Sequence, residues 1–137
     1  KGNVLNFITL RCKFRIQGYF MKNFLKTTVA KEPRVELHDK LNLTGSEISV
    51  NRLPAGTNVP FIHSHKENEE VYIILEGKGY FVIDNEKIEL NKGDFIKVDP
   101  NGERQLFAAK DSEIEYICIQ TKANSLEEYT AKDALIK

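Results

Sequence analysis

The chain has 137 residues, 41% of them hydrophobic, which is enough for a single domain with a buried core. Its formal net charge is zero, but residues 1–31 hold seven basic and no acidic side chains, so residues 32–137 carry a net charge of −7, which argues against nucleic-acid binding. No apolar run approaches the roughly 20 residues of a membrane helix, and two cysteines without a secretion signal predict reduced thiols in a cytoplasmic protein.

The first twenty residues contain a strand pattern. Between Ile8 and Ile16, apolar residues alternate with polar or basic ones, as in a half-buried strand. This alternation favours a solvated basic strand face over a nucleic-acid or membrane arm. Met21, the only methionine, resembles an ordinary protein start. We therefore interpret residues 1–20 as an N-terminal extension that adds an edge strand to a sheet or to a second subunit, and residues 21–137 as the domain.

Short strand-like runs follow one another from Val35 onward, separated by turn signals rich in Gly, Pro, Asn and Asp. The predicted strands are residues 47–53, 71–75, 80–83, 87–90, 95–98, 104–108 and 113–120. Strands this short and evenly spaced, with no helices between them, predict an all-β antiparallel sandwich or barrel. Near the end, Ser125 and Glu128 fit a capping box ahead of apolar residues at helical spacing, so we also predict a short C-terminal helix.

His63 and His65 are one residue apart within the stretch from Gly56 to Gly77. In an extended strand, residues i and i+2 point to the same face, so the two imidazoles aim at one point. Neutral imidazoles are good ligands for Zn, Cu, Fe and Ni, and the carboxylate pair just beyond offers a third ligand. Such His pairs are also common on solvated strands, and a polar barrel mouth without metal is the alternative.

The whole pattern resembles the cupin superfamily, whose members are small double-stranded β-helix (jelly-roll) barrels. Its first motif is a Gly, about five residues, His-x-His, three or four residues, Glu, six residues and Gly, and here it is matched by Gly56, His63, His65, Glu70 and Gly77 with one extra residue in the first gap. The second motif is matched by Gly93, Pro100 and Gly102. However, Gln105 stands where the family usually has a third histidine, and Ala109 stands where it has Asn. The resemblance covers about residues 45–121.

The resemblance implies that His63, His65 and Glu70 are metal ligands, with Gln105 as a fourth or auxiliary ligand. Strand phase supports Glu70 over Glu69 because Glu70 shares a face with Tyr72, although a register shift of one would exchange the two carboxylates. An amide in place of imidazole weakens Zn or Cu binding more than Fe(II) or Mn(II) binding. Gln105 could equally hydrogen-bond one of the metal-ligating side chains or a bound small molecule. We expect a substrate to contact Tyr72, Phe107 and Phe61, side chains predicted to point inward.

The resemblance therefore implies a homodimeric, metal-binding single-domain cupin. Its function would be that of a small metalloenzyme of dioxygenase or isomerase/lyase type, using Fe, Mn, Ni or Zn to act on a small oxygen-bearing molecule. The alternative is a non-catalytic barrel that binds or senses a small molecule. Arg52 is either a clamp for a substrate carboxylate or a residue at a strand end. Cys118 is expected to be a small buried hydrophobe.

Overall fold

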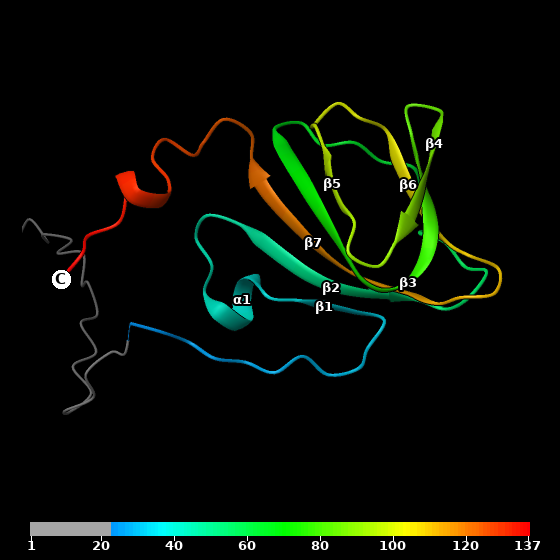
Figure 1. Ribbon diagram of the computed structural model, residues 1–137, viewed down its shortest axis with the longest axis horizontal. Coiled ribbons are helices and arrows are strands. Elements are labelled where there is room, and N and C mark those ends of the chain that lie inside the picture. Colours follow the sequence, from blue (N-terminus) through cyan, green and yellow to red (C-terminus); the bar gives the residue numbers. More distant parts are fainter. Residues whose placement is uncertain (1–22) are drawn as a thin grey trace, which may run out of the picture.

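The computed structural model describes residues 23–137 and consists mainly of strands (Figure 1). The predicted extension, residues 1–20, with its edge strand lies outside the described residues. The elements are β1 (Arg34–Glu36), α1 (His38–Leu41), β2 (Glu47–Leu53), β3 (Asn68–Ile83), β4 (Glu86–Asn91), β5 (Phe95–Val98), β6 (Arg104–Ala108), β7 (Ile114–Lys122) and the 3₁₀ turn η1 (Thr130–Lys132). The all-β prediction is confirmed. No helix in the part of the chain described here is long and apolar enough to cross a membrane.

Strand β3 joins the two halves of the barrel. Its first part pairs with β7 and β5, and residues 78–83 pair with β4 and β6, all antiparallel. Strands β2 and β1 extend the first half beyond β7. Figure 1 shows β3, in green, running from the β7 and β2 side toward β4 and β6. Because one strand serves both halves, their inward faces enclose a common interior.

The prediction of separate strands at 71–75 and 80–83 with a turn between them is wrong, because β3 is continuous with a register shift between Ile74 and Glu76. Gly77 has φ +77°, and a Cβ there would lie 1.8 Å from the carbonyl oxygen of Glu113. A Cβ on Gly79 would lie 2.1 Å from the carbonyl oxygen of Phe107. These glycines therefore permit close backbone approach where the strand bends, and they do not form a hairpin turn.

The core lies between the two halves. Alternate residues of β3, β6 and β7 are buried, as expected for strands with one inward face. The central cluster contains Tyr72, Ile74, Phe81, Leu90, Val98, Leu106, Ala108, Ile114, Tyr116 and Cys118. Among residues 23–137, the largest fully buried side chain, however, is that of Arg104. A charge at this depth requires a buried partner.

The predicted C-terminal helix is wrong, since only the single turn η1 forms there. The Ser125 hydroxyl donates to the Lys122 carbonyl at 2.7 Å rather than capping a helix. Leu126 and Ile136 are exposed, so no apolar helix face is buried against the barrel. A short helix is marginal without such packing, which explains why the local signals were not sufficient.

Candidate metal centre

The segment between β2 and β3 carries the two histidines along the edge of β6. The His63 N–H donates to the Arg104 carbonyl at 3.2 Å, and the Arg104 N–H donates to the His63 carbonyl at 2.9 Å. Residues directly opposite in an antiparallel pair point to the same face, so the His63 and Arg104 side chains enter the interior together. The His65 N–H donates to the Pro100 carbonyl at 2.8 Å, which fixes the second histidine.

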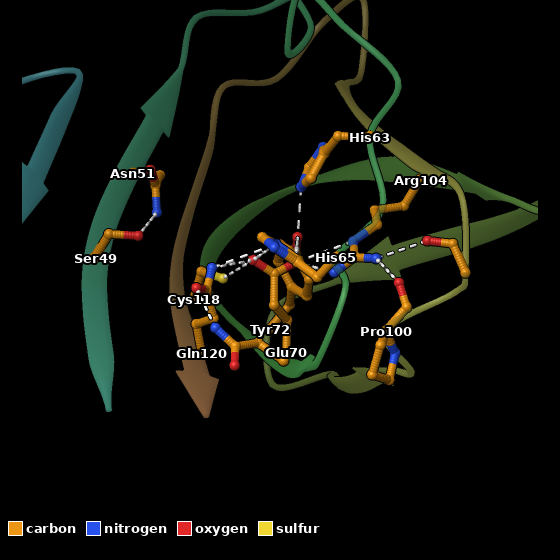
Figure 2. Close-up of polar contacts among 12 residues, drawn as sticks. Ser49, Asn51, His63, His65, Glu70, Tyr72, Pro100, Arg104, Cys118 and Gln120 are labelled. Atoms are coloured by element: carbon orange, nitrogen blue, oxygen red, sulfur yellow. Dashed lines mark hydrogen bonds and ion pairs between the residues drawn. The ribbon is translucent and has the colours of Figure 1, made fainter. Parts of the chain in front are cut away.

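His63, His65 and Glu70 come together as predicted (Figure 2). His65 Nε2 lies 3.0 Å from Glu70 Oε1, and His63 Nε2 lies 3.8 Å from Glu70 Oε2. One ligand atom from each of the three side chains lies within 4.8 Å of the others. Glu69 instead forms an ion pair with Lys97 at 3.5 Å. Strand phase therefore identified the carboxylate that lies beside the two histidines.

Arg104 is the site residue that sequence reasoning missed. It is fully buried, and its Nε and Nη2 donate to Glu70 Oε2 at 3.0 and 2.7 Å. Its Nη1 donates to the carbonyls of Pro100 and Gly102 at 3.3 and 2.6 Å, so the side chain also anchors the turn before β6. The available signal was phase, because Arg104 alternates with the apolar Leu106 and Ala108.

The structure does not bring Gln105 to the triad. It lies on the opposite face of β6 from Arg104, and its Nε2 donates to the Val59 carbonyl at 2.8 Å. Phe107 shares the Gln105 face, where its ring stacks on Tyr80 with centroids 4.7 Å apart, so Phe107 is likewise away from the interior. In a strand, a difference of one residue reverses the face. The inward residue at this point is Arg104.

The carboxylate of Glu70 is held by a dense set of donors. Besides Arg104, the Tyr72 hydroxyl donates to Oε2 at 2.5 Å, and Gln120 Nε2 donates to Oε1 at 3.2 Å. The Cys118 thiol lies 3.5 Å from Oε1. Burial alone raises the pKa of Glu70, but the hydrogen bonds from Tyr72 and Arg104 outweigh it and bring the pKa to about 2. Glu70 is therefore an anion at neutral pH.

Burial also favours the neutral form of the neighbouring groups His63, Tyr72 and Cys118, and there it prevails. It lowers the pKa of His63, an effect that the nearby Glu70 carboxylate only partly opposes. Burial, together with the smaller effect of the Glu70 charge, raises the pKa of Cys118 to about 12. Burial is also the main cause of the raised pKa of Tyr72. Among the described residues, His63 Nδ1 is buried without a hydrogen-bond partner. The site thus combines one anion and a neutral imidazole.

A cavity of about 580 Å³ opens from the triad. Tyr72 and Phe61 line it as predicted, and Phe61 packs edge-on against the His63 ring with centroids 5.5 Å apart. Arg52 also lines the cavity, but its Nε and Nη2 contact Glu115 at 3.1 and 3.0 Å, and its Nη1 bonds two backbone carbonyls. Each of its three guanidinium nitrogens therefore already has a partner. The remaining lining includes Arg34, Glu36, Glu47, Ser49, Asn51, Val59, Leu106, Tyr116, Cys118 and Gln120.

The donor set fits a divalent metal ion. Two imidazoles and a carboxylate form a common three-ligand set that leaves positions open, and a neutral His63 is ready to coordinate. Arg104 is unusual in this setting, because its positive charge sits on Glu70 Oε2 and opposes a second cation. The structure therefore supports a metal site at His63, His65 and Glu70 in which the carboxylate is shared with a buried arginine.

Comparison with known proteins identifies the family. The profile of the cupin domain matches residues 49–120. A cupin protein from Bacteroides fragilis is 58% identical, over 85% of this chain and 99% of that chain, with a TM-score of 0.83. Two further structures share the fold. A sugar phosphate isomerase from Silicibacter pomeroyi is 21% identical over 66% of this chain and 60% of that chain, with a TM-score of 0.59. A predicted oxalate decarboxylase from Thermotoga maritima is 23% identical over 55% of this chain and 64% of that chain, with a TM-score of 0.52.

A curated relative, an uncharacterized protein from Methanocaldococcus jannaschii, is 46% identical over 48 residues. That match spans 35% of this chain and only 38% of the relative, well under half of its length. It therefore adds no activity to the assignment. The profile match and the 58% identical structure together show that the chain belongs to the cupin family.

Proposed function

We propose that this cupin binds a divalent metal ion through His63, His65 and Glu70 and acts as a small metalloenzyme on an oxygen-bearing molecule. The observation that carries the proposal is the convergence of these ligand atoms within 4.8 Å at a cavity of about 580 Å³. The ion would be Fe, Mn, Ni or Zn, each compatible with mixed nitrogen and oxygen ligands. When bound, it would supply Lewis-acid chemistry for isomerase or lyase reactions, or dioxygen activation in the case of iron.

The surrounding residues would keep the ligands in place. Arg104 and Tyr72 donate to Glu70 Oε2 and hold the carboxylate ionised and oriented. Because Glu70 Oε1 only accepts, His65 Nε2 carries the proton in their 3.0 Å contact. Coordination through this nitrogen therefore requires His65 to lose the proton or move it to Nδ1. Tyr72 and Phe61 would form part of the substrate surface.

Arg104 supports a second candidate function, a barrel that binds or senses a small molecule without catalysis. Its guanidinium already supplies a positive charge to Glu70, at 2.7 Å. A metal ion is therefore not needed to balance the buried carboxylate. In this case His63 and His65 would hydrogen-bond the ligand directly.

Metal titration of the untagged protein distinguishes the two. We expect isothermal titration with Mn²⁺, Fe²⁺, Ni²⁺ and Zn²⁺ to give about one site per chain for at least one ion, and His63→Ala to remove it. His38→Ala is the matched control, because His38 lies outside the cavity and its ring contacts Asp39. If the wild-type protein takes up none of these ions, the metalloenzyme proposal fails and the binding-module proposal remains.

We also propose a homodimer. The outward positions of β3 and β7 are apolar, with Val71 opposite Ile119 and Ile73 opposite Ile117. An antiparallel sheet with a solvated face normally carries polar residues there. A second copy packed on this face would explain the pattern. Light scattering should give twice the 15.7 kDa chain mass, and Ile73→Lys should shift it to the monomer. A monomeric wild type at micromolar concentration would contradict the proposal.

A further inference from the structure

Three hydrogen-bonded polar side chains from β1 and β2 line the cavity wall on the far side of β7 from Glu70. Arg34 Nη1 donates to Asn51 Oδ1 at 2.7 Å, and Asn51 Nδ2 donates to Ser49 Oγ at 2.9 Å. All three side chains line the cavity that contains the triad, and Asn51 and Ser49 are only 4% and 2% exposed. Figure 2 shows Asn51 and Ser49 on β2, with β7 between them and the triad. The buried Asn51 and Ser49 and the more exposed Arg34 form a second, separate polar area in the cavity.

Arg34 has hydrogen-bond donors left for a ligand. A guanidinium carries five N–H groups, and in Arg34 the Nε contacts Glu36 at 3.0 Å while Nη1 contacts Asn51. Within residues 23–137, Nη2 contacts no acceptor and one Nη1 hydrogen is unused. These two nitrogens form the end of the guanidinium that binds a carboxylate in bidentate fashion. Arg52, the other lining arginine, has every nitrogen engaged.

Arg34 is also oriented before any ligand arrives. The buried Asn51 holds Nη1 from the cavity wall, and the Nε contact with Glu36 is solvent-exposed and contributes little. An arginine held in this way loses less side-chain entropy on binding.

We propose that the cavity takes a small carboxylic acid whose carboxylate binds the free end of Arg34 while an oxygen at the other end of the molecule reaches the triad. This substrate class rests on the proposed function for its triad end, but the Arg34 end stands on its own contacts. Arg34 lies on β1, but its guanidinium reaches Asn51 on β2. Neighbouring strands are about 4.8 Å apart, so β2 lies about 10 Å from β3, with β7 between them. A short dicarboxylate such as adipate, together with the bonds at its two ends, covers a distance of this order. Arg34 is thus a specificity-determining residue, and it lies outside residues 49–120 matched by the family profile.

The test uses adipate and its neutral isostere adipamide as probes, in calorimetric titrations of the full chain with and without Ni²⁺. We expect adipate to bind the wild type more tightly than adipamide. Arg34→Gln should weaken adipate binding at least about 10-fold, the usual effect of losing a charged hydrogen bond, and leave adipamide unchanged. Lys92→Gln is the matched control, because it removes a surface cation that pairs with Glu76 outside the cavity.

Equal adipate affinity in Arg34→Gln and wild type overturns the proposal, as does wild-type binding of adipamide as tight as that of adipate. Should Arg34→Gln fail to fold, Arg34→Lys decides. This variant keeps the positive charge but lacks the two nitrogens that bind a carboxylate in bidentate fashion. A loss of at least about 3-fold in adipate affinity therefore supports the proposal, and unchanged affinity overturns it. Ni²⁺ binding reports separately on the triad. Arg34-dependent adipate binding without Ni²⁺ uptake would support the anion site while the metal function fails. Ni²⁺ uptake without Arg34-dependent adipate binding would support the metal function and overturn the anion site.

Discussion

Arg104 provides the sharpest test of the energetics of the site. Arg104→Met removes a guanidinium with 0% exposure that makes two bonds to Glu70 and leaves the carboxylate buried without its cation. Removing one partner of a buried ion pair costs about 3–5 kcal/mol. The lowered pKa of Glu70 points the same way, because the bonds from Tyr72 and Arg104 outweigh the effect of burial on the carboxylate. We therefore expect Arg104→Met to lose about 3 kcal/mol or more of the free energy of unfolding.

The pH dependence follows from the sign of the same shift. The pKa of Glu70 is lower in the folded than in the unfolded protein, so its stabilisation is complete above about pH 4.5 and is lost as the pH falls toward 2. Urea unfolding followed by circular dichroism at pH 7 and at acidic pH measures both effects. In Arg104→Met, the part of the acid destabilisation that Glu70 contributes should shrink along with the stability at pH 7.

Lys92→Met is the control, since its ion pair with Glu76 is solvent-exposed and contributes little. The double variant Glu70→Gln/Arg104→Met should be more stable than Arg104→Met alone, because it no longer buries an unpaired charge. A loss in Arg104→Met no larger than that in Lys92→Met would show that Arg104 does not stabilise the buried Glu70 carboxylate.

Three further predictions concern single residues. Gly77→Ala should destabilise the barrel by about 3 kcal/mol or more, because its Cβ meets the Glu113 carbonyl, whereas Gly93→Ala, with positive φ but nothing within 4 Å, should cost about 1 kcal/mol in the same unfolding assay. The Cys118 thiol, with a pKa of about 12, should resist iodoacetamide at pH 8 in the folded protein and react after unfolding, as peptide mass spectrometry would show. Gln105→His should leave Zn²⁺ and Ni²⁺ affinities unchanged in calorimetry, and tighter binding would place its side chain at the triad.

The all-β fold and the three triad residues could be predicted because both depend on local periodicity. Strand alternation fixed the inward face of the segment that begins at Glu70, and it separated this carboxylate from Glu69. The His-x-His spacing carried the rest, although the structure places both histidines in a segment outside the regular strands. Backbone bonds to β6 and the turn before it fix that segment.

The errors arose where long-range contacts override local patterns. Gly77 and Gly79 indicated a turn from sequence, but their role is to let β3 pass close to other backbone, which depends on the tertiary structure. The C-terminal helix had its capping signals but no surface to pack against. Gln105, rather than Arg104, was taken as the residue of β6 that faces the interior, so Arg104 was overlooked. The cytoplasmic location stays a prediction.

The most direct test of the metal site is a crystal structure of the protein soaked or grown with Ni²⁺ and measured at the nickel absorption edge. We expect one anomalous peak at about 2.0–2.2 Å from a nitrogen of His63, a nitrogen of His65 and an oxygen of Glu70, with Arg104 still bonded to Glu70. An ordered site without an anomalous peak, and with His65 still 3.0 Å from Glu70, would contradict it.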